Sequence, residues 1–233
     1  QAALGAAVGV AVMGRTRPVW QAALTGAVVG TLPDLDVFVD QGDPIRNMVL
    51  HRAETHALFW QALASPVLGL LLAVITNSRP LFRRWWLMVV LTLFTHSALD
   101  AMTVYGTQIA LPFSNYPVGL GSLFIIDPAY TVWLLIGVLA IIFMRRAPDT
   151  AYRINAVMLS VATAYIGWSW VAKSYVTNVA ARSLEQQGIA YTRLLSTPAP
   201  FNTLLWRFVA MHPDGNYSEG YYSLFDGTRD VKF

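Results

Sequence analysis

The sequence contains no cysteine and few charged residues, and both shortages narrow what the protein can be. Without cysteine, disulfides and thiolate metal sites are excluded, so any metal ion must be held by nitrogen and oxygen ligands. Charged residues make up only 12% of the 233 positions, whereas 55% are hydrophobic, which is not the composition of a soluble globular domain. The apolar residues come in blocks, which predicts a protein embedded in a membrane.

Strong net charge and common catalytic loop motifs are also missing. The formal charge is only +3, and the basic residues form short clusters between apolar blocks. This pattern carries information on membrane topology and is not a nucleic-acid-binding surface, so no nucleic-acid partner is expected. There is no glycine-rich phosphate loop, GxSxG or HExxH motif.

The apolar blocks predict an all-α polytopic membrane protein with about six transmembrane or partly re-entrant helices. The first two blocks are short for a span, which takes roughly 20 residues, so they either cross within the bundle or form a hairpin that dips into the membrane. The predicted helices are residues 2–14, 20–32, 55–76, 85–105, 129–144 and 154–176.

Two domains are expected, with the boundary after the last apolar block. Residues 1–176 form the transmembrane helical domain, and residues 177–233 form a small extracytoplasmic module. The module's YTRLL, WRFVAMH and YYSLF pieces are separated by proline, asparagine and glycine, which predicts short β-strands joined by turns.

The arginine clusters predict which side of the membrane each connection faces. The GRTRP and RPLFRR segments and residues 145–153 lie in alternate connections, and the positive-inside rule places them in the cytoplasm. We therefore expect a multi-pass membrane protein. Its remaining connections, with their acidic and histidine residues, face the extracytoplasmic side.

The strongest functional signal is the stretch THSALDAMTVYGTQIALPFS, which begins at Thr95. His96 and Asp100 are four residues apart, so they share one face of a helix. Such residues in a membrane helix are costly unless they bind or pair with something.

Two further segments offer the same chemistry, because GTLPDLD contains Asp34 and Asp36 and HRAETH contains His51 and His56. We predict that all three segments form one site for a divalent cation. Zinc, manganese or iron(II) suits these ligands, as one ion or as two.

Several of these residues also have simpler interpretations. Asp34 and Asp36 are alternatively loop carboxylates or helix caps, and Asp127 before Pro128 is alternatively an N-cap. Arg52 pairs either with a substrate phosphate or with a nearby aspartate.

The segments QAALGAAVG, GTLPDLDVF, HRAETHALF, THSALDAMTVYGTQIALPFS and FIIDPAYT, in that order, resemble a bacterial family of inner-membrane proteins described as metal-dependent hydrolases. Gln1 corresponds to the last residue of the family's opening segment, and Glu54 replaces a residue that is more often apolar. The family is distantly similar to zinc-dependent phospholipase C, which favours phosphoester hydrolysis. The resemblance points to a set of metal ligands: Asp34, Asp36, His51, His56, His96, Asp100 and Asp127.

We therefore expect a membrane-embedded metal-dependent hydrolase that uses a metal-activated water to cleave an ester or phosphoester of a lipid or lipid-linked substrate. His96, Asp100 and Asp36 are the expected catalytic residues. Contacts with the substrate head group are expected from Arg52, Thr103 and Thr107. The alternatives are a metal-binding transporter or sensor, and a structural or regulatory membrane protein in which a polar network replaces the metal site.

Overall fold

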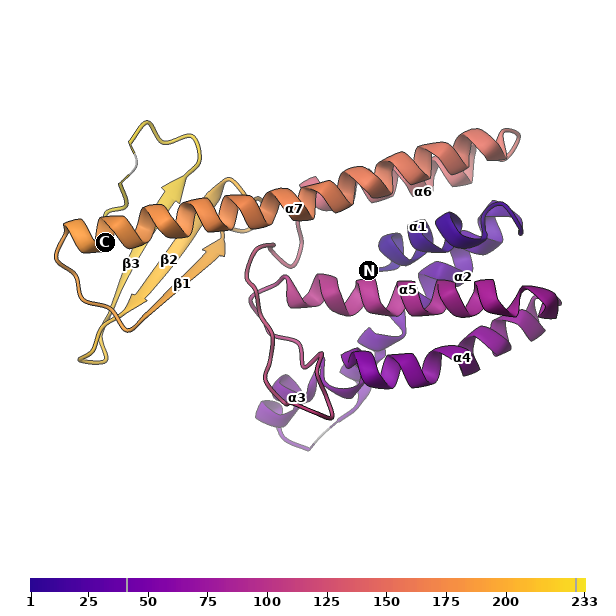
Figure 1. The fold of residues 1–233 in the computed structure, drawn as a ribbon, viewed down its shortest axis with the longest axis horizontal. Helices are drawn as coiled ribbons and strands as arrows, with labels where there is room; N and C mark the ends of the chain where they lie inside the picture. The colour runs from indigo at the N-terminus through magenta and orange to yellow at the C-terminus, as the bar shows by residue number, and fades with distance from the viewer. Residues whose placement is uncertain (41, 229) are drawn as a thin grey trace. The chain divides into compact units, whose positions relative to one another are not determined.

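The computed structural model describes residues 1–40, 42–228 and 230–233, where helices predominate and a small sheet follows them (Figure 1). The chain divides into two compact units. The first comprises Gln1–Ala101, Tyr105–Gly119 and Thr131–Ala162. The second comprises Met102–Val104, Leu120–Tyr130 and Thr163–Phe233. The expected domain boundary at residue 176 lies inside a long helix, α7 (Pro148–Gln186).

The first unit begins with a tightly packed helical hairpin, α1 (Ala2–Met13) and α2 (Val19–Thr31). Each helix carries two glycines four residues apart, a spacing that lets helix backbones approach closely. A Cβ atom added to Gly26 would lie only 2.1 Å from the carbonyl oxygen of Gly5. The hairpin therefore depends on the absence of side chains at this crossing.

Helix α5 (Phe82–Ala101) is the central helix of the first unit. It packs against α1, α2 and α4 (Leu58–Ile75), and the 3₁₀ helix η3 (Arg79–Leu81) joins α4 to α5. Its buried side chains recur at helical spacing, so one face enters the core. These buried positions include Trp85, Met88, Val89, Thr92, Leu93, His96, Ser97 and Asp100. The face that packs the core thus carries polar groups near its C-terminal end.

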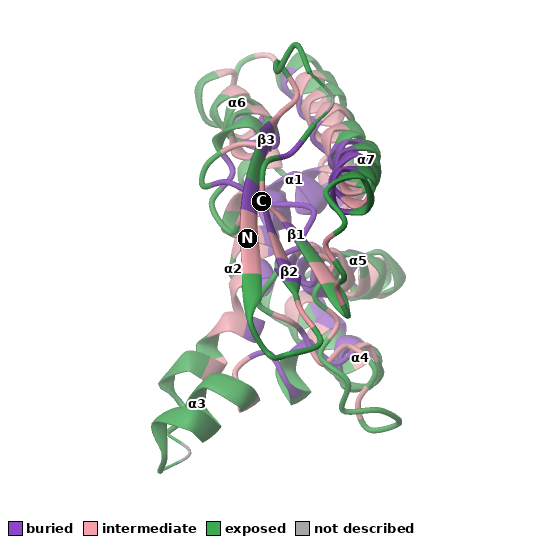
Figure 2. Cartoon of the chain, turned by 90° about the vertical axis from the view of Figure 1, so that its left-hand side faces the viewer, coloured by how far each residue is buried: buried purple, intermediate pink, exposed green. Residues whose placement is uncertain are grey.

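Three short helices connect α2 to α4. They are η1 (Pro33–Phe38), α3 (Pro44–Leu50) and η2 (Glu54–His56). Helix α3 is exposed along most of its length (Figure 2), whereas His56 at the end of η2 is fully buried. This connection therefore reaches from the surface into the interior within a few residues.

Helix α6 (Pro128–Phe143) and the long helix α7 complete the helical part of the chain. Within the first unit, Asn155 Nδ2 of α7 donates a hydrogen bond to the carbonyl oxygen of Ala7, at 2.9 Å. The expectation that the last helix ends at residue 176 was wrong, because α7 continues to Gln186. Residues 177–187 contain neither proline nor glycine, and the turn comes at Gly188, which has a φ of +69°.

The predicted strands of the C-terminal segment are confirmed. Strands β1 (Arg193–Pro198), β2 (Leu205–Met211) and β3 (Tyr217–Ser223) form an antiparallel sheet in the order β1-β2-β3. Alternate residues of β2 are buried, as expected for a sheet with one covered face. Within the second unit, these side chains share a core with α7 residues, and the cluster comprises Trp206, Phe208, Tyr222, Ala172, Val176, Val179, Ala180 and Val231.

The expectation of about six spans is not met by helix length and composition. Among the described residues, two helices are long and apolar enough to cross a membrane, α4 and α7. Helix α1 has 12 residues and reaches about 18 Å, which is too short to cross the hydrocarbon core alone. Helix α5 has 20 residues, and its apolar sequence lies between Arg83 and Arg84 at one end and Asp100 at the other.

Replacing Gly26 with alanine is expected to destabilise the hairpin, because its Cβ would collide with the Gly5 carbonyl. We expect Gly26→Ala to lower the free energy of unfolding by about 3 kcal/mol. Gly167→Ala is the matched control, since an added Cβ there meets nothing within 4 Å. It should be neutral or stabilising by about 0.5–1 kcal/mol through helix propensity. Thermal unfolding in detergent measures both, and equal midpoints for the two variants would contradict the close packing.

Candidate metal centre

Two histidines and two aspartates converge in the first unit. One ligand atom from each lies within 4.8 Å of the other three, in the group Asp34, His56, His96 and Asp100. The two histidine Nε2 atoms are 3.0 Å apart. Asp100 Oδ2 lies 3.1 Å from His56 Nε2 and 3.4 Å from His96 Nε2. Asp34 Oδ1 lies 3.7 and 3.4 Å from the same two nitrogens.

The four side chains come from three short pieces of the chain. Asp34 belongs to η1, which Pro33 begins directly after α2, and His56 belongs to η2. His96 and Asp100 lie one turn apart on α5, so the predicted sharing of one helix face is seen in the structure. The three segments proposed from the sequence therefore do meet.

The group is enclosed on most sides and accessible at one residue. The side chains of His56, His96 and Asp100 are 0%, 1% and 6% exposed, whereas that of Asp34 is 41% exposed. A small molecule would therefore reach the group from the side of Asp34.

Hydrogen bonds orient both imidazole rings from behind. His96 Nδ1 lies 2.8 Å from the carbonyl oxygen of Gly30, which can only accept, so this nitrogen carries the proton. His56 Nδ1 lies 2.9 Å from Thr55 Oγ1, and that hydroxyl donates to Asp36 Oδ2 at 2.8 Å. Each ring thus donates through Nδ1 and presents Nε2 to the other members of the group, as histidine ligands of metals do.

Asp36 lies outside the group of four and holds its surroundings together. Its Oδ1 is 2.8 Å from His51 Nδ1, and its Oδ2 accepts the backbone N–H of Arg52 at 3.0 Å. Its Oδ2 also lies 3.5 Å from His56 Nδ1, on the far side of that ring. The structure therefore gives Asp36 and His51, both expected as ligands, positions behind the group.

Carboxylates concentrate negative charge around His56. Burial alone lowers the pKa of His56, but hydrogen bonds with Asp100, Asp34 and Asp36 outweigh it and raise this pKa to about 10. Burial raises the pKa of Asp36, but hydrogen bonds with His56, the Arg52 amide and Thr55 lower it to about 2. Burial also opposes ionisation of Asp34, yet its hydrogen bonds with His56 and His96 hold its pKa well below the usual range. The group therefore attracts a cation, whether a proton or a metal ion.

The donor set and its spacing fit a zinc ion. Ligand atoms about 2.0–2.2 Å from zinc in a tetrahedron lie roughly 3.3–3.6 Å from one another. The histidine–histidine and histidine–aspartate distances range from 3.0 to 3.7 Å, and all four ligand atoms lie within 4.8 Å of one another. Two imidazole nitrogens and two carboxylate oxygens also suit manganese or iron(II).

Gln1 contacts the group, although it was not among the expected site residues. Its Nε2 donates to Asp100 Oδ1 at 2.7 Å, which leaves Oδ2 directed at the histidines. The available signal was its correspondence to the last residue of the family's opening segment.

Arg52 occupies a strained turn beside the group. Its φ of 64° lies in the left-handed region that residues with a side chain rarely adopt. This turn brings its Nε to 3.5 Å from Asp100 Oδ2 and its guanidinium to 5.0 Å from the ring centre of Tyr105. Of the two interpretations of Arg52, the structure shows pairing with an aspartate.

The remaining expected site residues have other surroundings. Asp127 belongs to the second unit, where its Oδ1 caps α6 through the backbone N–H groups of Ala129 and Tyr130. Its Oδ2 accepts a hydrogen bond from the Tyr165 hydroxyl at 3.0 Å, so the capping interpretation describes what is seen. Thr103 and Thr107 are both buried, and contact with a substrate head group stays a prediction for them.

A cavity of about 590 Å³ lies in the first unit, and none of the four clustered residues lines it. His51, which is bonded to Asp36, lines it together with both polar and apolar residues. The other lining residues are Met48, Val49, Leu50, Glu54, Tyr105, Gly106, Gln108, Leu111, Asn115 and Pro117. A cavity of this size and mixed lining suits an amphipathic small molecule.

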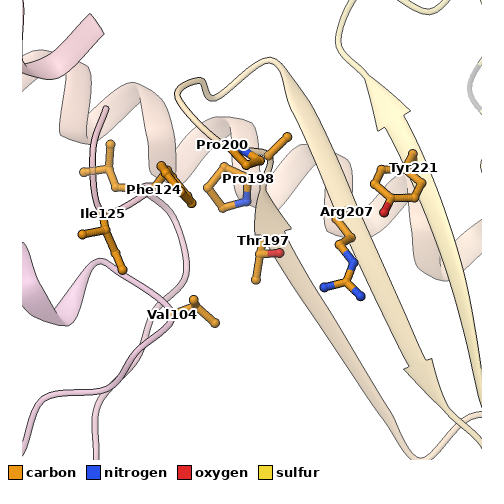
Figure 3. Close-up of a pocket in the computed structure, with 10 residues that line it drawn as sticks. Val104, Phe124, Ile125, Thr197, Pro198, Pro200, Arg207 and Tyr221 are labelled. Carbon is orange, nitrogen blue, oxygen red and sulfur yellow. The ribbon is translucent and has the colours of Figure 1, made fainter. Parts of the chain in front are cut away.

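The second unit has its own cavity, of about 400 Å³ (Figure 3). Thr197, Arg207 and Tyr221 are cross-strand neighbours that lie along it, and Val104, Phe124 and Ile125 are among its apolar residues. Arg207 makes two hydrogen bonds to Glu219, at 2.7 and 3.1 Å, so its charge is balanced within the sheet. None of the four clustered residues lines this cavity.

Metal binding is expected to release protons and to tighten as pH rises. With a pKa of about 10, His56 is protonated near neutral pH in the metal-free protein, but it must be neutral to bind a metal. Between about pH 6 and pH 8, affinity should rise about tenfold per pH unit for each proton released. Calorimetric zinc titrations in buffers of different protonation enthalpy measure this release, and a pH-independent affinity would contradict the assignment.

Substitutions should rank residues by their distance from the metal. We expect His96→Ala to abolish bound zinc, and Asp36→Asn to weaken binding about 10–100-fold because it only orients ligands. His212→Ala is the control, since His212 belongs to the second unit and contacts Ser218 and the Ala190 carbonyl. Metal analysis of purified protein reads out all three, and retention of stoichiometric zinc by His96→Ala would refute the site.

Comparison with known proteins identifies the family of this chain. No curated protein and no solved structure matches the chain. The family described as YdjM inner membrane protein matches residues 1–176, which contain the whole group of four and its hydrogen-bonded surroundings. The chain belongs to the YdjM inner membrane protein family, the metal-dependent hydrolase family that its motifs resemble.

Proposed function

We propose that this protein is a membrane-embedded hydrolase that uses a divalent metal to cleave an ester or phosphoester of a lipid or lipid-linked substrate. The observation that carries the proposal is the convergence of two imidazole Nε2 atoms and two carboxylates, with both Nδ1 atoms engaged behind the rings. A purely structural histidine does not require this orientation, whereas a metal ligand does. Zinc fits best, with manganese or iron as alternatives.

The four ligands divide into a buried set and an accessible one. A zinc ion bound here would activate a water molecule and polarise a carbonyl or phosphoryl oxygen of the substrate. His56, His96 and Asp100 would hold it from the protein side, and Asp34 is the most exposed of the four.

His51 is placed to move protons between the cavity and bulk solvent. It lines the 590 Å³ cavity, and its Nδ1 is bonded to Asp36, which fixes the ring. A histidine oriented by a carboxylate is the usual arrangement for general acid–base chemistry. We therefore assign His51 the transfer of protons between this cavity and solvent.

In this proposal the substrate is a membrane lipid, and the orientation of the protein determines which face of the membrane the metal centre acts on. Helix α5 begins with Arg83 and Arg84 and carries His96 and Asp100 near its other end. Arginine-rich connections favour the cytoplasm, which supports an extracytoplasmic metal centre. A site at this level could act on a lipid without extracting it from the bilayer.

The proposal is tested in liposomes of phosphatidylethanolamine and phosphatidylglycerol that contain the zinc-loaded protein. We expect release of fatty acid or phosphorylated head group, detected by mass spectrometry, and its loss in His96→Ala together with the metal. His51→Gln should keep its zinc but slow turnover about 10²–10⁴-fold. A zinc-loaded wild type that cleaves no lipid, or an equal rate in His96→Ala, would overturn the proposal.

A further inference from the structure

Helix α3 displays an apolar stripe that the rest of the first unit leaves uncovered. Ile45, Met48 and Val49 follow the i, i+3, i+4 spacing of one helix face. They are 70%, 60% and 50% exposed, which is unusual for three large apolar side chains side by side. Asn47 is on the opposite side and hydrogen-bonds to Asp40 Oδ1 at 3.2 Å. The helix is therefore amphipathic, with its apolar side turned outward.

The ends of α3 are fixed although its stripe is not packed. Asp43 caps its N-terminus by accepting the backbone N–H of Ile45 at 2.7 Å. At its other end the carbonyl oxygens of Met48 and Val49 accept hydrogen bonds from Tyr105 Oη and Gln108 Nε2. A helix of seven residues is marginal in water alone, so a surface that covers the stripe would stabilise it.

Apolar side chains before α3 add to the exposed surface. Val37, Phe38 and Val39 are 63%, 81% and 54% exposed. The α3 surface is the stripe of Ile45, Met48 and Val49, whereas Val39 lies with Asn47 and Leu50 along another cavity. A water-soluble surface rarely carries so many exposed large apolar side chains without a partner.

Aromatic residues nearby indicate that the partner is a lipid bilayer. Phe59 and Trp60 stand at the start of α4, a candidate membrane span, and Phe59 contacts Phe113 of the following loop with ring centres 5.3 Å apart. Aromatic side chains gather at the boundary between hydrocarbon and water. His56 lies two residues before α4, so this boundary is at the level of the metal centre.

We propose that α3 lies in the membrane interface, with the α3 surface inserted among phospholipid acyl chains. Interfacial helices bind by such an apolar face while their polar face stays in the head-group layer. A hydrogen bond between Asp36 and His51 joins the two ends of the segment that contains α3. Met48, Val49 and Leu50 line the 590 Å³ cavity. Resting on the proposed function, this gives a lipid substrate a route from the bilayer into the cavity.

The absence of cysteine allows the insertion to be measured with single labels. Ile45→Cys, Met48→Cys and the matched control Asn47→Cys are each labelled with a polarity-sensitive fluorophore in the full chain, in phosphatidylethanolamine–phosphatidylglycerol liposomes. We expect blue-shifted emission at positions 45 and 48, with quenching by doxyl lipids at least about threefold stronger than at position 47. Aqueous iodide should show the reverse order.

Equal iodide quenching at all three positions would overturn the proposal, because the stripe would then face water. Shielding of positions 45 and 48 from both quenchers, with energy transfer between labelled copies, would also overturn it, because a second copy would cover the stripe. Neither readout needs bound zinc or turnover. A failure to hydrolyse lipid therefore leaves the insertion result standing, and a failure to insert leaves the metal centre standing.

Discussion

The candidate metal centre depends on one close contact, in which the Nε2 atoms of His56 and His96 are held 3.0 Å apart. Because each ring donates its proton through Nδ1, both Nε2 atoms would present lone pairs to each other, which is unfavourable without a cation between them. Asp100 and Asp34 add negative charge at the same place, and the raised pKa of His56 expresses the same demand for positive charge. A proton can satisfy it near neutral pH, and a divalent ion with two histidine and two carboxylate ligands satisfies it more completely.

The helices that hold the two imidazole rings in place also pack the core of the first unit. The glycine-mediated approach of α1 and α2 carries Gly30 to the end of α2, where its carbonyl oxygen fixes the ring of His96. The same hairpin places Gln1 against Asp100. The α1–α2 hairpin therefore also orients the side chains of His96 and Asp100 on α5.

The sequence predicted the ligands on α5 better than their surroundings. The four-residue spacing of His96 and Asp100 follows directly from helix geometry, and the pairing of three motifs followed from their composition. The division of PDLD into an exposed ligand, Asp34, and an orienting residue, Asp36, depends on the η1 turn and on Thr55. Such a distinction arises from tertiary contacts that no local pattern contains.

Long-range structure was also where the predicted fold went wrong. The strands were recognisable from short runs between turn residues, but the length of α7 was not, because a polar helix continues where an apolar one ends. Fewer helices than predicted have the length and composition of a span, because short apolar helices such as α1 resemble spans in composition while lacking their length. Asp127 illustrates a third difficulty, since an aspartate before proline reads equally well as a ligand or as the cap that it forms.

The central claim is that a metal ion is held by His56, His96, Asp34 and Asp100. X-ray absorption at the zinc edge, on purified protein loaded with one equivalent of zinc, tests it most directly. We expect two imidazole nitrogens and at least two oxygens at about 2.0–2.2 Å from the zinc ion. A spectrum with fewer than two imidazoles, or a protein that retains no zinc after desalting, would contradict it.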